Sequence, residues 1–256
     1  MKLIKLLLIV PVLLILSPHT CYSITKKRSL EFEAGLSYDR LSKDYDDWKS
    51  SYLEVKKKAG EGLFLYGSAR EVKRYGITEN EFMAGAVLPL GEKVTAAFDA
   101  AFGPEGVVMP KHSYNVNIGW TLGKGWAAQT GLRKREYENS DIILANIALE
   151  NYFSNYRASF SILPSQVDSS HNSMSYNVRM DRYYGEGNFT GLSFSVGEEV
   201  ENIPGSGTAR SDISSLVFLG RHWFSDLWGL SYQIWAHRQG DYYERHGLRS
   251  GFRFRF

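Results

Sequence analysis

The last ten residues of the chain, GLRSGFRFRF (247–256), alternate between arginine and phenylalanine towards their end. Successive side chains of a β-strand point to opposite faces. The apolar face of such a strand carries Leu248, Phe252, Phe254 and Phe256, and the opposite face carries Arg249, Arg253 and Arg255. This strand places its apolar face either in the core of a β-sandwich or against a lipid bilayer, and the rest of the sequence distinguishes the two.

The first residues have the pattern of a secretory signal peptide. Two lysines within Met1–Lys5 precede an unbroken apolar run, Leu6–Leu16, and a polar segment follows. The apolar run is shorter than the roughly 20 residues that a membrane-spanning helix needs. We expect export by the Sec pathway and cleavage after Ser23, so that residues 1–23 form the signal peptide and residues 24–256 form one domain.

Composition excludes several classes of function. Cys21 is the only cysteine, and we expect it to leave with the signal peptide; its acylation in a lipoprotein is the less favoured alternative. The exported chain would then hold no disulfide and no cysteine-based catalytic or zinc site. The formal net charge of +2 gives no argument for nucleic acid binding, and we expect neither a metal nor a cofactor.

Period-two alternation of apolar and polar residues runs through almost the whole exported chain. It is clearest in LEFEAGLSY (30–38) and YNVNIGWTL (114–122), where every second residue is apolar. Tight connections such as GKG (123–125) alternate with longer polar ones such as YGITEN (75–80), GPEGVVMPK (103–111) and EEVENIPGSGTARSD (198–212). Short turns on one side and longer loops on the other are typical of bacterial transmembrane barrels. We therefore predict an all-β antiparallel barrel of about 14 strands, or about 12 if two weak segments merge.

The aromatic residues favour the bilayer over the sandwich, whereas the charged faces alone do not decide, because a sandwich could expose them. The polar faces of the predicted strands carry Glu31, Glu33, Glu54, Asp99, Arg133, Arg135, Glu150, Arg157, Arg179, Asp181, Arg249, Arg253 and Arg255. Aromatic residues cluster where strands meet the short turns, as in an interfacial girdle: Trp120, Trp126, Phe153, Tyr156, Trp223 and Trp228. The terminal phenylalanine also resembles the insertion signal that the barrel-assembly machinery reads. The phenylalanines are thus expected to face lipid and the arginines a lumen.

Four segments carry a resemblance to a known family: GLSYDRLSKDYDDW (35–48), REVKRYGITENEF (70–82), TGLRKREYENSD (130–141) and ENYFSNYRASFSI (150–162). With them, the exported chain resembles the YaiO-type outer-membrane β-barrel family over essentially its whole length. The resemblance implies an integral outer-membrane protein with no defined catalytic site, and it hints at a link to surface carbohydrate.

The inward charges divide into two predicted groups. The pore-lining candidates are Arg133, Arg135, Asp99, Arg179, Asp181 and Arg249, because opposed charges in a hydrated lumen create a field that selects solutes. The predicted structural ion pairs involve Glu31, Glu33, Arg253 and Arg255 at the seam between the first and last strands, and Glu150 with Arg157 across the turn at 152–155.

Two other motifs invite a chemical interpretation. His171 and Ser173 resemble the His-x-Ser arrangement of outer-membrane lipid hydrolases, but Met174, Tyr176 and Val178 take the lipid-facing positions of that strand, so the pair faces away from a lipid substrate. The acidic stretch DYDDW (44–48) lacks the glycine and the distal glutamate of a calcium loop.

We therefore predict a narrow passive channel for small hydrophilic solutes, or a structural barrel. A lipid- or glycan-modifying enzyme is the alternative. The expected partners are outer-membrane lipid, lipopolysaccharide and the assembly machinery, with no nucleic acid.

Overall fold

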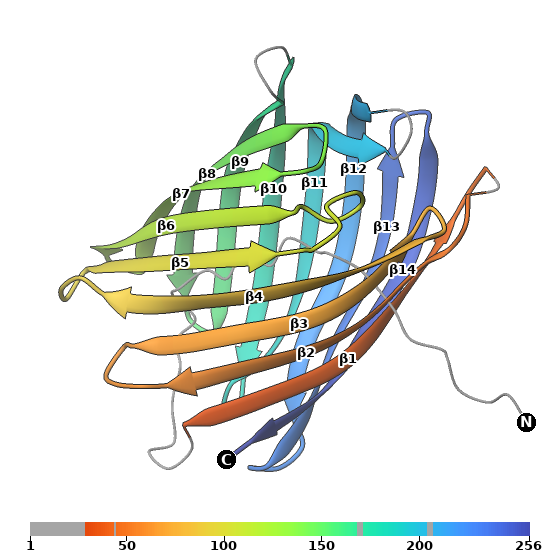
Figure 1. The fold of residues 1–256 in the computed structure, drawn as a ribbon. Helices are drawn as coiled ribbons and strands as arrows, with labels where there is room; N and C mark the ends of the chain where they lie inside the picture. The colour runs from red at the N-terminus through yellow and green to blue at the C-terminus, as the bar shows by residue number, and fades with distance from the viewer. Residues whose placement is uncertain (1–28, 44, 168–170, 204–206) are drawn as a thin grey trace, which may run out of the picture.

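The computed structural model describes residues 29–43, 45–167, 171–203 and 207–256, and the predicted signal peptide lies outside these ranges. The described chain forms one closed antiparallel barrel (Figure 1). Its 14 strands are β1 (Leu30–Leu41), β2 (Trp48–Lys58), β3 (Phe64–Arg74), β4 (Ile77–Pro89), β5 (Val94–Phe102), β6 (His112–Gly123), β7 (Trp126–Glu136), β8 (Asp141–Phe153), β9 (Tyr156–Val167), β10 (His171–Tyr184), β11 (Asn188–Ile203), β12 (Gly207–Trp223), β13 (Trp228–Gln239) and β14 (Tyr243–Arg255). The predicted count of 14 is confirmed, and the alternative of 12 is wrong.

Each strand pairs with its sequence neighbours, and β14 pairs with β1 to close the barrel. At the seam, Leu30 and Phe256 exchange two backbone hydrogen bonds of 3.2 and 2.8 Å. Both ends of the barrel domain therefore lie at the same rim, as an even number of strands requires. We call this rim the periplasmic end and the opposite rim the outer end.

The side chains of the last strand face the sides of the barrel that the sequence predicts. Leu248 is 50% and Phe252 58% exposed on the outside of the barrel, whereas Arg249 between them is only 8% exposed. Because the outside is apolar along every strand, it suits lipid rather than water. Within the described residues, no helix is long and apolar enough to span a membrane.

One aromatic residue departs from the predicted girdle. Trp126, Phe153 and Trp228 are each more than 40% exposed on the outer surface, but Trp223 faces the lumen. There it packs under the guanidinium groups of Arg253 and Arg255, whose central carbons lie 5.2 and 4.3 Å from the ring centroid. Trp223 faces the lumen because it has an odd residue number in β12, and the odd-numbered side chains of that strand point inward.

Several connections at the outer end are shorter than the sequence suggests. The segment YGITEN (75–80), expected as a loop, contains only the two-residue turn Tyr75–Gly76, and both residues adopt positive φ angles. Strand β4 therefore begins at Ile77 and includes Glu79. Likewise, most of the expected loop at 198–212 belongs to the paired strands β11 and β12. These segments form strands despite their polar composition, because continued pairing satisfies their backbone N–H and C=O groups.

Large inward aromatic side chains fill the lumen next to glycines. A Cβ added at Gly85 would lie 2.5 Å from the ring of Tyr66, and one at Gly35 would lie 2.4 Å from that of Tyr52. These glycines let the tyrosines lie flat along the inner wall of the barrel. Two small apolar clusters close to the outer end complete the interior: Val72, Val108 and Met109 in one, and Leu41, Trp48 and Tyr243 in the other.

Candidate functional site

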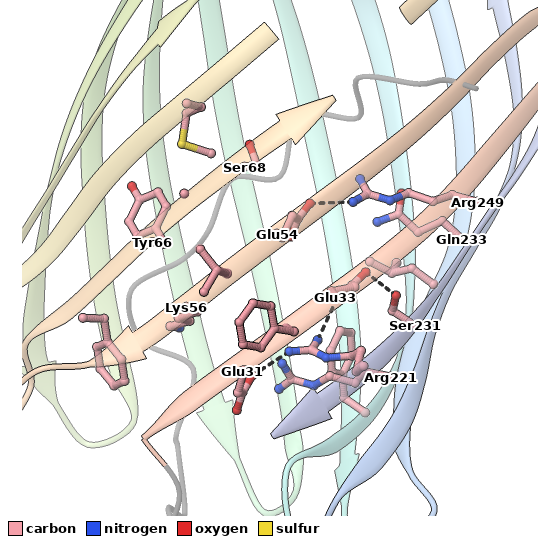
Figure 2. A pocket seen from close by; sticks show the side chains of 18 of the residues that line it. Glu31, Glu33, Glu54, Lys56, Tyr66, Ser68, Arg221, Ser231, Gln233 and Arg249 are labelled. Carbon is pink, nitrogen blue, oxygen red and sulfur yellow. Dashed lines mark hydrogen bonds and ion pairs between the residues drawn. The ribbon is translucent and has the colours of Figure 1, made fainter. Parts of the chain in front are cut away.

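Several cavities lie inside the barrel, and two of them are lined by many of the predicted residues. The first, of about 280 Å³, lies in the periplasmic half and is lined by charged residues from both sides of the seam. Figure 2 shows Glu31, Glu33 and Glu54 projecting into it from the first two strands, with Arg249 and Ser231 from the last two. The second, of about 270 Å³, lies in the outer half and is bounded by Trp48, Arg74 and Tyr243. Asp99, Arg133 and Arg249 line both cavities.

Charged residues at the seam form a compact ion cluster. The backbone register places Glu31 opposite Arg255 and Glu33 opposite Arg253. The side chains pair differently: Arg253 lies 2.7 Å from Glu31 and 3.4 Å from Glu33, so one guanidinium bridges two carboxylates. Arg255 instead donates to the carbonyl of Asp226 at 2.8 Å. Three of the four predicted seam residues thus form ion pairs with one another, and Arg255 does not.

Glu150 and Arg157 belong to a larger cluster than the sequence suggests. They are diagonal rather than direct neighbours, because Arg157 is opposite Tyr152 in the register. Their charged groups are 3.7 Å apart, but Arg157 binds Asp181 of β10 more closely, at 2.8 Å from Nε. Asp181 is fully buried and also accepts from Arg179 at 2.9 Å. Asp181 therefore lies inside a wall-bound ion cluster and has no exposure to the lumen.

Arg249 and Asp99, two further pore-lining candidates, also have partners. Arg249 is 2.7 Å from Glu54, and its guanidinium carbon lies 3.8 Å from the centroid of the Tyr52 ring. Asp99 accepts from Asn115 at 2.7 Å and from Tyr66 at 3.3 Å. Both side chains therefore border the cavities and also form ion pairs or hydrogen bonds with side chains of other strands.

Arg133 and Arg135 differ from the other inward arginines. Both line the outer cavity, and within the described residues neither forms an ion pair. The Nε group of Arg133 is buried and has no hydrogen-bond partner in this part of the chain. These two residues therefore place positive charge in the lumen without a direct ion pair within the described residues, with Asp99 and Glu81 as the nearby carboxylates of Arg133. Their assignment as selectivity residues stays a prediction.

A loop folded into the barrel was not predicted. The carboxylate of Glu79, which is fully buried, accepts three backbone N–H groups: those of Val107 at 2.9 Å, Val108 at 3.1 Å and Met109 at 2.7 Å. These bonds hold the β5–β6 connection (103–111) inside the outer end, where its backbone curls back from the strand ends (Figure 1). The available signal was the apolar triplet at 107–109, which is unusual for a loop exposed to water.

The His-x-Ser motif does not form a lipid-facing pair. Ser173 is buried on the lumen side, where its hydroxyl is 2.5 Å from that of Ser165, its partner in the register. The side chain of His171 lies outside the described residues. Asp44 of the acidic stretch also lies outside them, and within the described part of the chain no group of histidine and acidic residues has the arrangement of a metal site.

Solved structures of outer-membrane proteins share this architecture. A bacterial polysaccharide outer membrane secretin matches with a TM-score of 0.55 and 10% identity, over 90% of this chain and 99% of that chain. Omp33 of Acinetobacter baumannii matches with a TM-score of 0.53 and 12% identity over 89% and 99%. OmpF of Salmonella typhi, solved with daunomycin, matches with a TM-score of 0.51 and 7% identity over 89% and 97%. At these identities the likeness concerns the fold alone.

Sequence comparison is more specific. A search of curated protein sequences finds no match. The model of the YaiO membrane beta barrel domain matches residues 29–202, which is more than half of the chain. The protein therefore belongs to the YaiO family of outer-membrane β-barrels.

Proposed function

We propose that this protein is a narrow, passive outer-membrane channel for small hydrophilic solutes and not an enzyme. The observation that carries the proposal is the pair of inward arginines, Arg133 and Arg135, which line the outer cavity and form no ion pair within the described residues. A structural barrel gains little from placing such arginines in its interior, because desolvation of a charged group is costly. In a channel the same charge attracts solute ions and sets selectivity.

The geometry also supports a narrow passage rather than a wide pore. The Glu79-bound loop occupies part of the outer end, and the ion clusters of the seam and of β8–β10 project from the wall below it. Between these features lie cavities of about 270 and 280 Å³. These cavities are below the range of roughly 300–1,000 Å³ found for sites of drug-sized ligands. A solute of monosaccharide size is the largest that we expect to pass without loop movement.

The test is single-channel conductance of the refolded barrel in planar bilayers, compared with the variant Arg133→Ala/Arg135→Ala. We expect steady conductance in the wild type and a shift of the reversal potential towards cations in the double variant. Arg182→Ala is the matched control, because Arg182 lies exposed on the outer face of β10. A barrel that is folded by circular dichroism but never conducts would refute the channel.

A further inference from the structure

We infer that the outer half of the lumen is a binding chamber for a small solute that carries an oxyanion, either a carboxylate or a phosphate. This inference rests on the proposed channel and names its class of solute. The chamber is the cavity of about 270 Å³ between Trp48, the arginines of β3 and β7, and the folded loop 103–111.

Cations outnumber anions on the chamber wall. Six arginines line it, Arg70, Arg74, Arg133, Arg135, Arg245 and Arg249, against four carboxylates, Glu54, Glu81, Asp99 and Glu199. Three of the arginines are neutralised locally. Arg70 lies 2.6 Å from Glu81 and Arg249 lies 2.7 Å from Glu54, while Arg245 lies 3.6 Å from Asp39.

The other three arginines form no ion pair within the described residues: Arg74, Arg133 and Arg135. The Nε groups of Arg74 and Arg133 are buried and have no hydrogen-bond partner in that part of the chain. Burying a donor N–H group without a partner is unfavourable, and an acceptor that binds there removes this penalty. An oxyanion supplies this acceptor and the opposite charge together.

Trp48 adds an uncharged donor to the same wall. Its side chain is 1% exposed and lines the chamber, and its Nε1–H is buried without a partner in the described chain. The ring is fixed on several sides: the guanidinium of Arg74 lies 4.4 Å from its centroid, and Tyr75 and Tyr243 pack edge-on at 5.3 and 5.5 Å. A fixed, unpartnered indole N–H suits a second acceptor on the solute, such as a hydroxyl or ring oxygen.

The folded loop forms the roof of the chamber and limits the size of the solute. Val108, Met109 and Pro110 line the cavity, and Glu79 holds the first two by their backbone N–H groups. An acceptor-rich molecule with one acidic group and a few hydroxyls matches these walls. A sugar acid and a phosphorylated monosaccharide are the two forms of this chemistry that we would test.

The first experiment is isothermal titration calorimetry of the folded barrel in a non-ionic detergent. Glucuronate and glucose 6-phosphate are the probes, and glucose is the neutral control. We expect saturable binding of at least one acidic probe, at least tenfold tighter than that of glucose. The two probes distinguish a carboxylate site from a phosphate site. Equal heats for all three sugars, or no heats above dilution, would overturn the inference.

Variants separate a binding role from a structural one. Arg74→Gln should weaken binding of the acidic probe at least tenfold, because it removes a charged hydrogen-bond donor. In the absence of probe the barrel should lose little stability, because Arg74 forms no ion pair within the described residues and contributes mainly its contact with the Trp48 ring. Arg182→Gln on the outer face should change neither quantity. A variant Arg74→Gln that loses stability but keeps its affinity would overturn the inference.

Conductance distinguishes this inference from the proposed function. Probe binding by a barrel that never conducts would refute the channel and leave the binding chamber in place. Conductance without preferential binding of an acidic probe would refute the chamber and leave the channel. With both correct, millimolar glucuronate or glucose 6-phosphate should reduce the open-channel current, and glucose at the same concentration should not.

Discussion

Replacing Glu79 by glutamine should release the loop at 103–111 and raise the conductance of the barrel. In the wild type one carboxylate oxygen accepts the N–H of Val107, and the other accepts those of Val108 and Met109. A glutamine keeps one acceptor oxygen and presents an NH₂ group in place of the other. At least one backbone N–H is then left facing a donor inside a buried site.

The magnitude follows from these three bonds. A hydrogen bond to a charged group is worth about 1.5–3 kcal/mol, and an unsatisfied buried donor costs about 1–3 kcal/mol. Bonds that share one carboxylate are not additive, so we expect Glu79→Gln to weaken loop closure by about 2–3 kcal/mol. Since 1.4 kcal/mol corresponds to a factor of ten, the open-loop population should rise roughly 30- to 150-fold. Barrel stability should change less, because the strands keep their backbone pairing.

Two assays measure this effect. Single-channel recordings should show a larger and more variable current for Glu79→Gln, and limited trypsinolysis should cut the loop faster at Lys111. Glu92→Gln is the matched control, because Glu92 is exposed in the turn at the other end of β4. If Glu79→Gln and the wild type share the same current and the same cleavage rate, the carboxylate does not hold the loop, and the reasoning fails.

Three further substitutions test the interior, each by urea unfolding in lipid vesicles. Asp181→Asn should cost about 3–5 kcal/mol, because it leaves the buried Arg157 and the partly buried Arg179 without their shared carboxylate; a loss below 1 kcal/mol would contradict this. Arg253→Ala should cost about 1–3 kcal/mol by freeing Glu31 and Glu33 at the seam, and an effect no larger than that of the exposed Arg238→Ala would refute it. Gly85→Ala should cost about 1–3 kcal/mol, because its Cβ would lie 2.5 Å from the Tyr66 ring; unchanged stability would show that the ring moves aside freely.

The alternation of apolar and polar residues predicts much of this fold, because it can be recognised within a single strand. Counting residues places Arg249 and Phe252 on opposite faces of the strand. The bilayer requires apolar side chains on one face, and the lumen accepts polar side chains on the other. The same counting placed Ser173 away from the lipid, and in the structure this residue is buried on the lumen side. What it cannot supply is the loop at 103–111, since the binding of its backbone by Glu79 depends on a strand expected to begin later in the chain.

Ion-pair partners on neighbouring strands are harder to predict than the faces on which side chains lie. A turn relates only the two strands that it joins, so it suggested Glu150 as the partner of Arg157. The closest partner, Asp181, comes from the next strand, β10. Likewise, Glu31 pairs with Arg253, two residues along β14 from its register neighbour Arg255, because a long arginine side chain can reach across two residues of strand rise.

Arginines that form ion pairs and arginines that do not lie in different parts of the barrel wall, which suggests that these parts have different roles. The seam and β8–β10 carry arginines bound to carboxylates, and such ion pairs suit strands that close and stabilise the barrel. Within the described residues, β3 and β7 carry three arginines that form no ion pair, Arg74, Arg133 and Arg135, and the folded loop arises from β5 and β6 between them. The loop and these arginines thus lie in the same sector of the wall. In the proposed channel, a solute that enters from outside would pass the loop beside these arginines. For this reason a change in the loop should alter selectivity as well as current, whereas a change at the seam should alter only stability.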